Sequence, residues 1–182
     1  YDLTPYLDEA DNVLAVRTDT SKQPASRWYA GSGINRHVRL LTTGPVHLGH
    51  DSTFVTTPAV AKDSAVVRVQ TTVRNDSDAP CALTVMVTVH GPPGSAPDGA
   101  YAATGESPGR TLAPGQSADL GVDVNIPWAP RLWDLDHPDL HDAQVRVMSG
   151  GKAIDEEHVP FGVRRFEFRP DTGFGLNGRN LK

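Results

Sequence analysis

The stretch from Ala65 to His90 reads AVVRVQTTVRNDSDAPCALTVMVTVH, and its alternation predicts two β-strands. In residues 65–74 and again in residues 81–90, apolar side chains occupy every second position. A half-buried antiparallel strand has this pattern because successive side chains point to opposite faces of the sheet. The polar residues 75–80 between the two runs are typical of a turn, so we expect the strands to pair as a β-hairpin.

The same period of two recurs further along the chain. It runs through residues 119–126, and again through residues 143–147, where the chain turns at Gly150-Gly151 into residues 152–159. No stretch of helical length carries an apolar stripe with a period of 3.6 residues. Strands at intervals of about 8 to 12 residues, separated by turn clusters, predict an all-β fold with an immunoglobulin-like β-sandwich at residues 51–166.

The segments around these strands are less regular. Residues 12–19 and 34–42 are interpreted as two further strands, joined by a loop that contains Trp28. Residues 91–110 are rich in Gly, Pro, Ala and Ser without an apolar pattern, so we expect a long exposed loop there.

Composition excludes several classes of partner. The 182 residues carry a formal net charge of −5 and contain no basic stripe, which argues against nucleic acid and anionic membranes as partners. The longest apolar runs are too short to span a bilayer, and the first 30 residues lack the pattern of a targeting segment. The single cysteine, Cys81, forms no internal disulfide, so a cytoplasmic and a secreted location both stay open.

A run rich in aromatic residues and glycine precedes residue 40. Residues 26–38 read SRWYAGSGINRHV, in which Gly31-Ser32-Gly33 predicts a tight turn beside Trp28 and Tyr29. The run resembles the segment S-R-W-Y-S-G-S-G-I-Y-R-H-V of bacterial β-galactosidases of glycoside hydrolase family 2.

Four further segments resemble the same family in the same order. They are residues 1–7 with 12–17 (YDLTPYL, NVLAVR), 45–58 (PVHL through TFVTTP), 132–140 (LWDLDHPDL), and 161–164 with 174–178 (FGVR, FGLNG). The departures are Asn35, where the family has an aromatic residue, and Asp134-Leu135, where it more often has Ser-Pro.

The resemblance implies a division into three parts. Residues 1–50 would be the C-terminal part of a sugar-binding jelly-roll domain, residues 51–166 the immunoglobulin-like domain, and residues 167–182 the lead-in to a missing TIM barrel. Both ends of the chain are interpreted as cut within a longer protein.

The same resemblance implies that this region has no catalytic residue. A retaining glycosidase needs two carboxyl groups about 5 to 5.5 Å apart. In the family these are glutamates of the barrel, and none of this chain's five glutamates stands in a matching segment. We therefore expect a non-catalytic region that scaffolds the barrel and shapes the rim of its sugar pocket, without a cofactor of its own. Its partners would be that barrel and, in the parent protein, a β-galactoside.

Arg27, Trp28 and Tyr29 are the candidates for that rim. An aromatic ring covers the apolar face of a galactose ring, and a guanidinium supplies paired donors to its hydroxyls. The alternative is that Trp28 anchors an interface, since burying about 200 Å² supplies at most about 5 kcal/mol.

Two other patterns favour structural interpretations. The carboxylates and histidines of residues 134–142 are the residue types that bind metals, but Pro138 stands where an EF-hand loop needs its third ligand, which favours a polar connection and no metal site. Asn75-Asp76-Ser77 fits the glycosylation pattern, although such tripeptides are common in turns.

Alternatives to the β-galactosidase hypothesis remain. The chain could be a free-standing carbohydrate-binding or adhesive β-sandwich, or the same region of a β-glucuronidase or β-mannosidase. A homo-oligomer also stays open. We expect apolar surface around residues 13–16 and Trp28 to be exposed or covered by a second copy.

Overall fold

The computed structural model describes residues 1–19, 21, 33–95 and 101–181. The chain forms two compact units, Tyr1–Leu41 and Thr42–Lys182. In the described part of the chain, no helix has the length and apolar content needed to cross a membrane.

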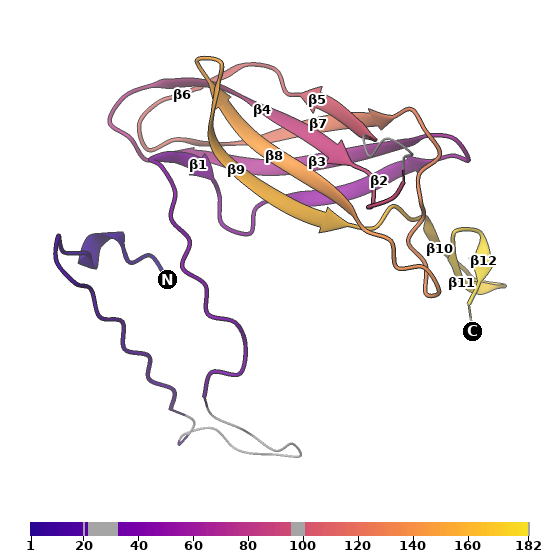
Figure 1. Ribbon diagram of the computed structural model, residues 1–182, viewed down its shortest axis with the longest axis horizontal. Coiled ribbons are helices and arrows are strands. Elements are labelled where there is room, and N and C mark those ends of the chain that lie inside the picture. Colours follow the sequence, from indigo (N-terminus) through magenta and orange to yellow (C-terminus); the bar gives the residue numbers. More distant parts are fainter. Residues whose placement is uncertain (20, 22–32, 96–100, 182) are drawn as a thin grey trace. The chain divides into compact units, whose positions relative to one another are not determined.

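The second unit contains a sandwich of two antiparallel sheets (Figure 1). In the first sheet β3 (Ala65–Asn75) pairs with β1 (Val46–Leu48), β2 (Phe54–Val60) and β7 (Ser117–Ile126). In the second, β4 (Cys81–His90) pairs with β5 (Ala102–Glu106), β6 (Arg110–Leu112) and β8 (His141–Ser149), and β8 also pairs with β9 (Lys152–Phe161). The prediction of an all-β sandwich is confirmed.

A small third sheet follows the sandwich. It consists of β10 (Phe166–Arg169), β11 (Gly173–Leu176) and β12 (Arg179–Asn180), in that order (Figure 1). Its three strands lie in residues 166–182, most of which were expected to lead into a barrel.

The core lies between the two main sheets and is built mostly of valine. The alternation of the sequence identifies it, because the inward positions of β3, β4, β7 and β8 are mostly β-branched and their outward positions mostly polar. The fully buried valines are Val67, Val69, Val73, Val85, Val87, Val89, Val124, Val145, Val147 and, after β9, Val163.

The predicted hairpin between residues 65–74 and 81–90 is wrong. Both runs are strands, but β3 and β4 belong to different sheets and face each other across the core. Residues 75–80 therefore form an arch between the layers. Alternation shows which face of a strand is buried, and two strands that oppose each other across a core have the same alternation as two that pair.

The hairpin predicted at Gly150-Gly151 is present. Ser149 pairs with Lys152, and the two glycines between them have φ values of 56° and 77°. These positive values define the type I′ geometry that joins two antiparallel strands by two residues.

The sequence predicted a long exposed loop at residues 91–110, and this prediction is wrong in part. Residues 102–106 form β5, which pairs with β4. A Cβ on Gly105 would lie 2.8 Å from the carbonyl oxygen of Asp123 and 3.0 Å from Val122 Cγ1. Glycine lets β5 approach β7 of the other sheet closely, so the composition that suggested a loop instead permits close packing.

The strands expected at residues 12–19 and 34–42 are absent from the described residues. In the first unit the only regular element described is a 3₁₀ helix, Thr4–Tyr6. An extended segment becomes a strand only when a neighbour accepts and donates its backbone hydrogen bonds, and the described residues 1–42 contain no such ladder.

The sandwich includes β1, which lies before residue 51, the first residue of the expected domain. Val46 and Leu48 are buried, and β1 pairs with β3 from Val46–Asn75 to Leu48–Val73. The Leu48 N–H donates to Asp155 Oδ2 on β9 at 2.7 Å, which ties the edges of the two sheets together.

Candidate functional site

The predicted rim residues Arg27, Trp28 and Tyr29 lie outside the described residues. Among the described residues earlier in the chain, Val13, Leu14 and Val16 are exposed, with 92% of the Val13 surface accessible. The expectation that residues 13–16 present apolar surface is therefore confirmed. Toward the opposite end of the chain, several segments meet around one side chain.

Asn177 is the centre of a joint between the small sheet and the sandwich. Its Nδ2 donates to the carbonyl oxygen of Trp133 at 3.1 Å, and its Oδ1 accepts the N–H of Arg165 at 2.9 Å. Its own N–H donates to the Arg165 carbonyl at 2.6 Å. One residue thus connects the segment before β8, the segment after β9, and the β11–β12 turn.

The turn that carries Asn177 explains its geometry. Asn177 and Gly178 have φ values of 52° and 82° and lie between the paired residues Leu176 and Arg179. Asn-Gly is the preferred pair for a type I′ turn because both residues tolerate positive φ. The turn therefore directs the side-chain amide of Asn177 toward Trp133.

Trp133 fills the other side of this joint. Its N–H donates to the Val163 carbonyl at 2.8 Å, and the Arg164 guanidinium carbon lies 4.9 Å from the centre of its ring. A Cβ on Gly162 would lie 2.6 Å from Trp133 Cβ. Glycine at 162 therefore lets the tryptophan pack directly on the backbone.

The segment after Trp133 forms a turn that the Asp134 side chain stabilises. Asp134 Oδ1 accepts the N–H groups of His137 at 2.6 Å and Asp136 at 2.8 Å, and these bonds, that from His137 above all, lower the pKa of Asp134. Asp136 in turn lies 3.4 Å from Arg179 of β12. Asp134, Asp136 and Arg179, together with Leu176 and Asn177, line a hollow of about 240 Å³.

These bonds give the acidic segment 134–142 a structural role. Asp139 pairs with Arg131 at 3.0 Å, and Asp142 accepts from His158. Across the described ranges, no three His, Cys, Asp or Glu side chains gather in a way that could hold a metal ion.

The small sheet presents an exposed aromatic face. Phe166 and Phe168 are 59% and 76% exposed, and their rings meet edge to face with centres 6.3 Å apart. Phe174 of β11 extends the cluster, 5.1 Å from Phe168. Exposed aromatic residues that touch one another are typical of a surface that packs against another protein part.

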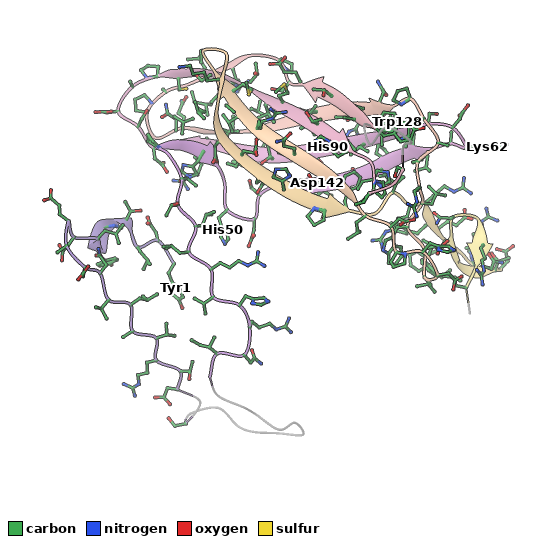
Figure 2. All side chains as sticks on the ribbon, in the orientation of Figure 1. Tyr1, His50, Lys62, His90, Trp128 and Asp142 are labelled. Carbon is green, nitrogen blue, oxygen red and sulfur yellow. The ribbon has the colours of Figure 1, made fainter. Side chains whose placement is uncertain are left out.

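Two histidines of the second sheet have opposite environments. His141 is 1% exposed, tilts against Phe161, and has no partner for either ring nitrogen, so burial lowers its pKa to about 4. His158 lies on the outer face, where its bond of 2.6 Å to Asp142 raises its pKa. Asp142 follows His141 on β8 and lies opposite His90 in the register of β8 with β4 (Figure 2).

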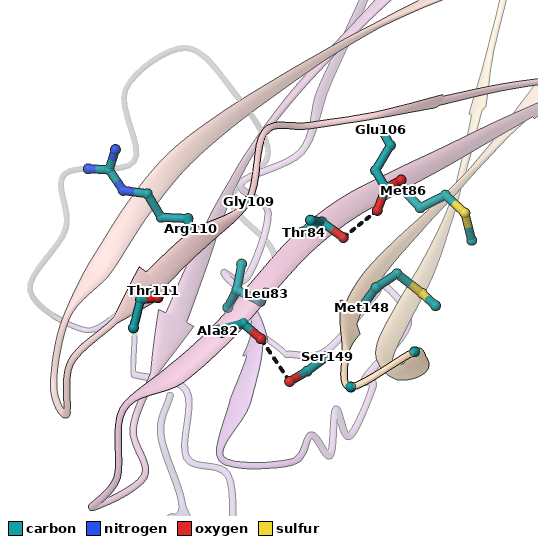
Figure 3. Close-up of a pocket in the computed structure, with 12 residues that line it drawn as sticks. Ala82, Leu83, Thr84, Met86, Glu106, Gly109, Arg110, Thr111, Met148 and Ser149 are labelled. Atoms are coloured by element: carbon teal, nitrogen blue, oxygen red, sulfur yellow. Dashed lines mark hydrogen bonds between the residues drawn. The ribbon is translucent and has the colours of Figure 1, made fainter.

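A broad open hollow of about 470 Å³ lies where the partner of β4 changes from β5 to β6 (Figure 3). Met86 and Met148 line it, and two polar pairs cross it (Figure 3). Thr84 donates to Glu106 at 2.6 Å and Ser149 donates to the Ala82 carbonyl at 2.8 Å. Thr84, Glu106 and Ser149 are thus engaged within the protein, and no observation assigns the hollow a function.

Sequence reasoning found part of the joint. The segments 132–140, 161–164 and 174–178 had been quoted for their resemblance, and Asn177-Gly178 is a recognisable turn signal. The contact of Arg164 with Trp133 and the edge-to-face pair of Phe166 and Phe168 were missed. Arg164 and Trp133 lie far apart in sequence, so no local pattern indicates their contact. Phe166 and Phe168 are two residues apart and share one face of β10, a strand that had not been predicted.

Comparison with known proteins agrees with this geometry. The model of glycosyl hydrolases family 2 matches residues 46–164. The chain is 39% identical to the β-galactosidase BoGH2A of Bacteroides ovatus, over 100% of this chain and 21% of that protein. It is 31% identical to a putative β-glucuronidase of Formosa agariphila, over 100% of this chain and 16% of that protein.

A solved structure has a similar fold. The crystal structure of a glycosyl hydrolase family 2 member from Bacteroides cellulosilyticus superposes with a TM-score of 0.78 and 32% identity, covering 88% of this chain and 21% of that one. The chain thus spans about a fifth of the length of such relatives.

The two-layer sandwich and its clamped C-terminal sheet define an immunoglobulin-like β-sandwich module. The chain belongs to glycosyl hydrolases family 2 and corresponds to a non-catalytic region of its members.

Proposed function

We propose that this chain scaffolds the catalytic barrel of a glycoside hydrolase that acts on β-galactosides. In this proposal residues 51–166 buttress the barrel, residues 167–182 lead into it, and residues 1–50 complete a jelly roll whose loop shapes the rim of the sugar pocket. The observation that carries the proposal is the exposed aromatic face of Phe166 and Phe168 on a sheet held to the sandwich through Asn177.

The joint supports a scaffolding role because it fixes the orientation of the small sheet relative to the sandwich. The small sheet is connected to the segment before β8 by the hydrogen bond from Asn177 Nδ2 to the Trp133 carbonyl and by the ion pair of Arg179 with Asp136, while the two bonds between Asn177 and Arg165 hold β10 to β11. A barrel that packs on Phe166 and Phe168 would therefore be held at one orientation. Burying each ring would contribute about 2 kcal/mol.

The rim role concerns Arg27, Trp28 and Tyr29. It rests on the sequence run of residues 26–38, and the same unit of the chain exposes the apolar residues Val13 and Leu14. In the whole protein, substitution of a residue that contacts sugar is expected to raise KM, whereas substitution of an interface anchor is expected to lower the midpoint of thermal inactivation.

The experiment for the reaction is an assay of the whole protein on nitrophenyl β-D-galactoside, β-D-glucuronide and β-D-mannoside. We expect the highest kcat/KM on the galactoside. The glucuronide is the second candidate, because a relative at 31% identity is named a putative β-glucuronidase. Highest kcat/KM on the glucuronide would overturn the choice of sugar, and no hydrolysis of any of the three would overturn the proposed enzyme.

A further inference from the structure

The exposed phenylalanines and the hollow of about 240 Å³ beside Asn177 lie on the same face of the small sheet. Residues that pair across antiparallel strands share a face of their sheet. Phe166 pairs with Leu176 of β11, and Leu176 pairs with Arg179 of β12. Leu176 and Arg179 both line the hollow. The aromatic face therefore leads directly into this hollow.

The hollow has apolar walls and room for one side chain. Leucines from three segments line it, namely Leu135, Leu176 and Leu181. Leu176 is 5% exposed, whereas Leu135 is exposed at the surface. The volume is below the range of about 300 to 1,000 Å³ that is typical of small-molecule sites. A single side chain of another protein part therefore fits this hollow better than a free substrate does.

Two carboxylates and one guanidinium line the same hollow. Asp134 accepts two backbone N–H groups with Oδ1, and Asp136 accepts Arg179 with Oδ2. The other oxygen of each carboxylate has no partner within the described ranges. The pair of Arg179 with Asp136 is a single contact of 3.4 Å between side chains that are 75% and 70% exposed, so it contributes little stability. The hollow thus has a net negative charge and free acceptors.

Apolar walls beside free carboxylate oxygens match a long basic side chain. Arginine packs its stem on apolar surface and keeps its charged head at the polar edge. Its guanidinium can also bind a carboxylate through two parallel N–H groups. An anionic group would be repelled by the two carboxylates, and an apolar side chain would remove their water without replacing its hydrogen bonds.

We propose that this hollow is the socket for an arginine side chain of the protein part that packs on Phe166 and Phe168. The proposal rests on the proposed scaffolding role, in which that part is the catalytic barrel. The stem of the arginine would lie on Leu176 and its guanidinium would bind Asp136 in place of Arg179. Such a charged contact beside the aromatic face would fix the register of docking.

The test is an NMR titration of the isotope-labelled 182-residue chain with N-acetyl-L-arginine amide. Saturable shifts are expected at the side-chain amide of Asn177 and the backbone amides of Arg179 and Leu181, with a Kd of about 1 to 10 mM. N-acetyl-L-citrulline amide has nearly the same shape without the charge, and it should bind at least about fivefold more weakly. Equal binding of the two probes, or shifts confined to other surfaces, would overturn the proposal.

Two variants test the charge of the hollow in opposite directions. Asp136→Asn keeps the backbone N–H that Asp134 accepts and should weaken binding of the arginine probe about fivefold or more. Asp171→Asn, at an exposed position of the turn between β10 and β11, is the matched control and should change binding less than twofold. Arg179→Gln removes the competing guanidinium and should tighten binding at least about twofold, which no loss of folding would produce. Unchanged binding in Asp136→Asn would contradict the socket.

Failure of the socket can be told apart from failure of the scaffolding role. The titration involves neither a barrel nor hydrolysis, so absence of arginine binding overturns the socket and leaves the scaffolding role standing. The scaffolding role is tested by substitution of Phe166 and Phe168 in the whole protein, because the proposed barrel contact is measured only there.

Discussion

Asn75 Nδ2 on β3 donates to the carbonyl oxygen of Leu112 on β6, 2.9 Å away, and so joins the two sheets at the arch that connects them. The same nitrogen donates to the Ala79 carbonyl, and Asn75 Oδ1 accepts from the hydroxyl and the N–H of Ser77. The residue is fully buried with every polar atom of its side chain engaged.

Removing this amide should destabilise the fold strongly. Asn75→Ala removes the side-chain partner of the buried Leu112 carbonyl and of the Ser77 N–H, at about 1 to 3 kcal/mol for each buried group that stays unpaired, whereas the Ser77 hydroxyl still donates to the Ala79 carbonyl at 3.0 Å. We expect the free energy of unfolding in urea to fall by about 3 kcal/mol. Asn125→Ala, at an exposed position of β7, is the matched control and should change it by less than about 0.5 kcal/mol. Equal effects would contradict the assigned role.

The burial of Asn75 also bears on its glycosylation pattern. A glycan on Nδ2 would break the bonds to Leu112 and Ala79, so the folded chain does not offer this nitrogen to a transferase. Secreted from a eukaryotic host, the chain should show an unmodified peptide at Asn75 by mass spectrometry. A glycosylated, folded chain would contradict the hydrogen bonding described.

His141 should make the fold sensitive to acid. Its pKa is about 4 when folded and about 6.5 when unfolded, so the unfolded chain binds more protons between these values. Stability is full above pH 6.5 and falls as pH drops toward 4, by at most about 3 kcal/mol. The charged pair Asp139 and Arg131 faces the ring, Asp139 raising and Arg131 lowering the pKa, but desolvation dominates.

The check is urea unfolding of the wild type and His141→Leu from pH 7 to pH 4. The variant should lose less stability over this range and be at least as stable at pH 7, because the wild-type ring nitrogens are unpaired. His50→Leu, an exposed histidine, is the control and should follow the wild type. Parallel curves for His141→Leu and the wild type would refute the assignment.

His158 should show the opposite shift. Its hydrogen bond to Asp142 raises its pKa above 6.5, so this contribution to stability is present below that pH and is lost as pH rises through the folded value. The ring is half exposed, which keeps the contribution below about 1 kcal/mol. In an NMR titration Asp142→Asn should lower the pKa of His158, and an unchanged value would show that Asp142 is not the cause.

Gly162 should tolerate no side chain. In Gly162→Ala the new Cβ would lie 2.6 Å from Trp133 Cβ, so the backbone or the tryptophan must move. We expect a loss of roughly 2 kcal/mol in unfolding free energy. Gly109→Ala, where a Cβ meets nothing within 4 Å, is the control, and a similar loss there would indicate a general cost of replacing glycine.

The alternating valines made much of the fold predictable. Val67 and Val69, like Val85 and Val87, are buried as their spacing requires. Alternation does not show which strand a given strand pairs with. For that reason the arch at Asn75 was mistaken for a hairpin turn. β5 was missed because its pairing relies on backbone bonds and on the absence of a side chain at Gly105.

In the joint, the local turn was predictable and the contact between distant residues was not. Asn177-Gly178 encodes its own turn through local backbone preference, which one dipeptide is enough to reveal. The stacking of Arg164 on Trp133 joins residues far apart in sequence, and only the folded path of β8 and β9 brings them together.

In the proposed function, Phe166 and Phe168 dock the catalytic barrel of a glycoside hydrolase. Its most direct test is the half-life of nitrophenyl β-galactoside hydrolysis at elevated temperature, in the whole protein with Phe166→Ser and Phe168→Ser combined. The account predicts a half-life shortened at least about tenfold, since a loss of 1.4 kcal/mol is already tenfold, while Ile154→Ser stays within twofold of the wild type. A double variant that keeps the wild-type half-life would contradict it.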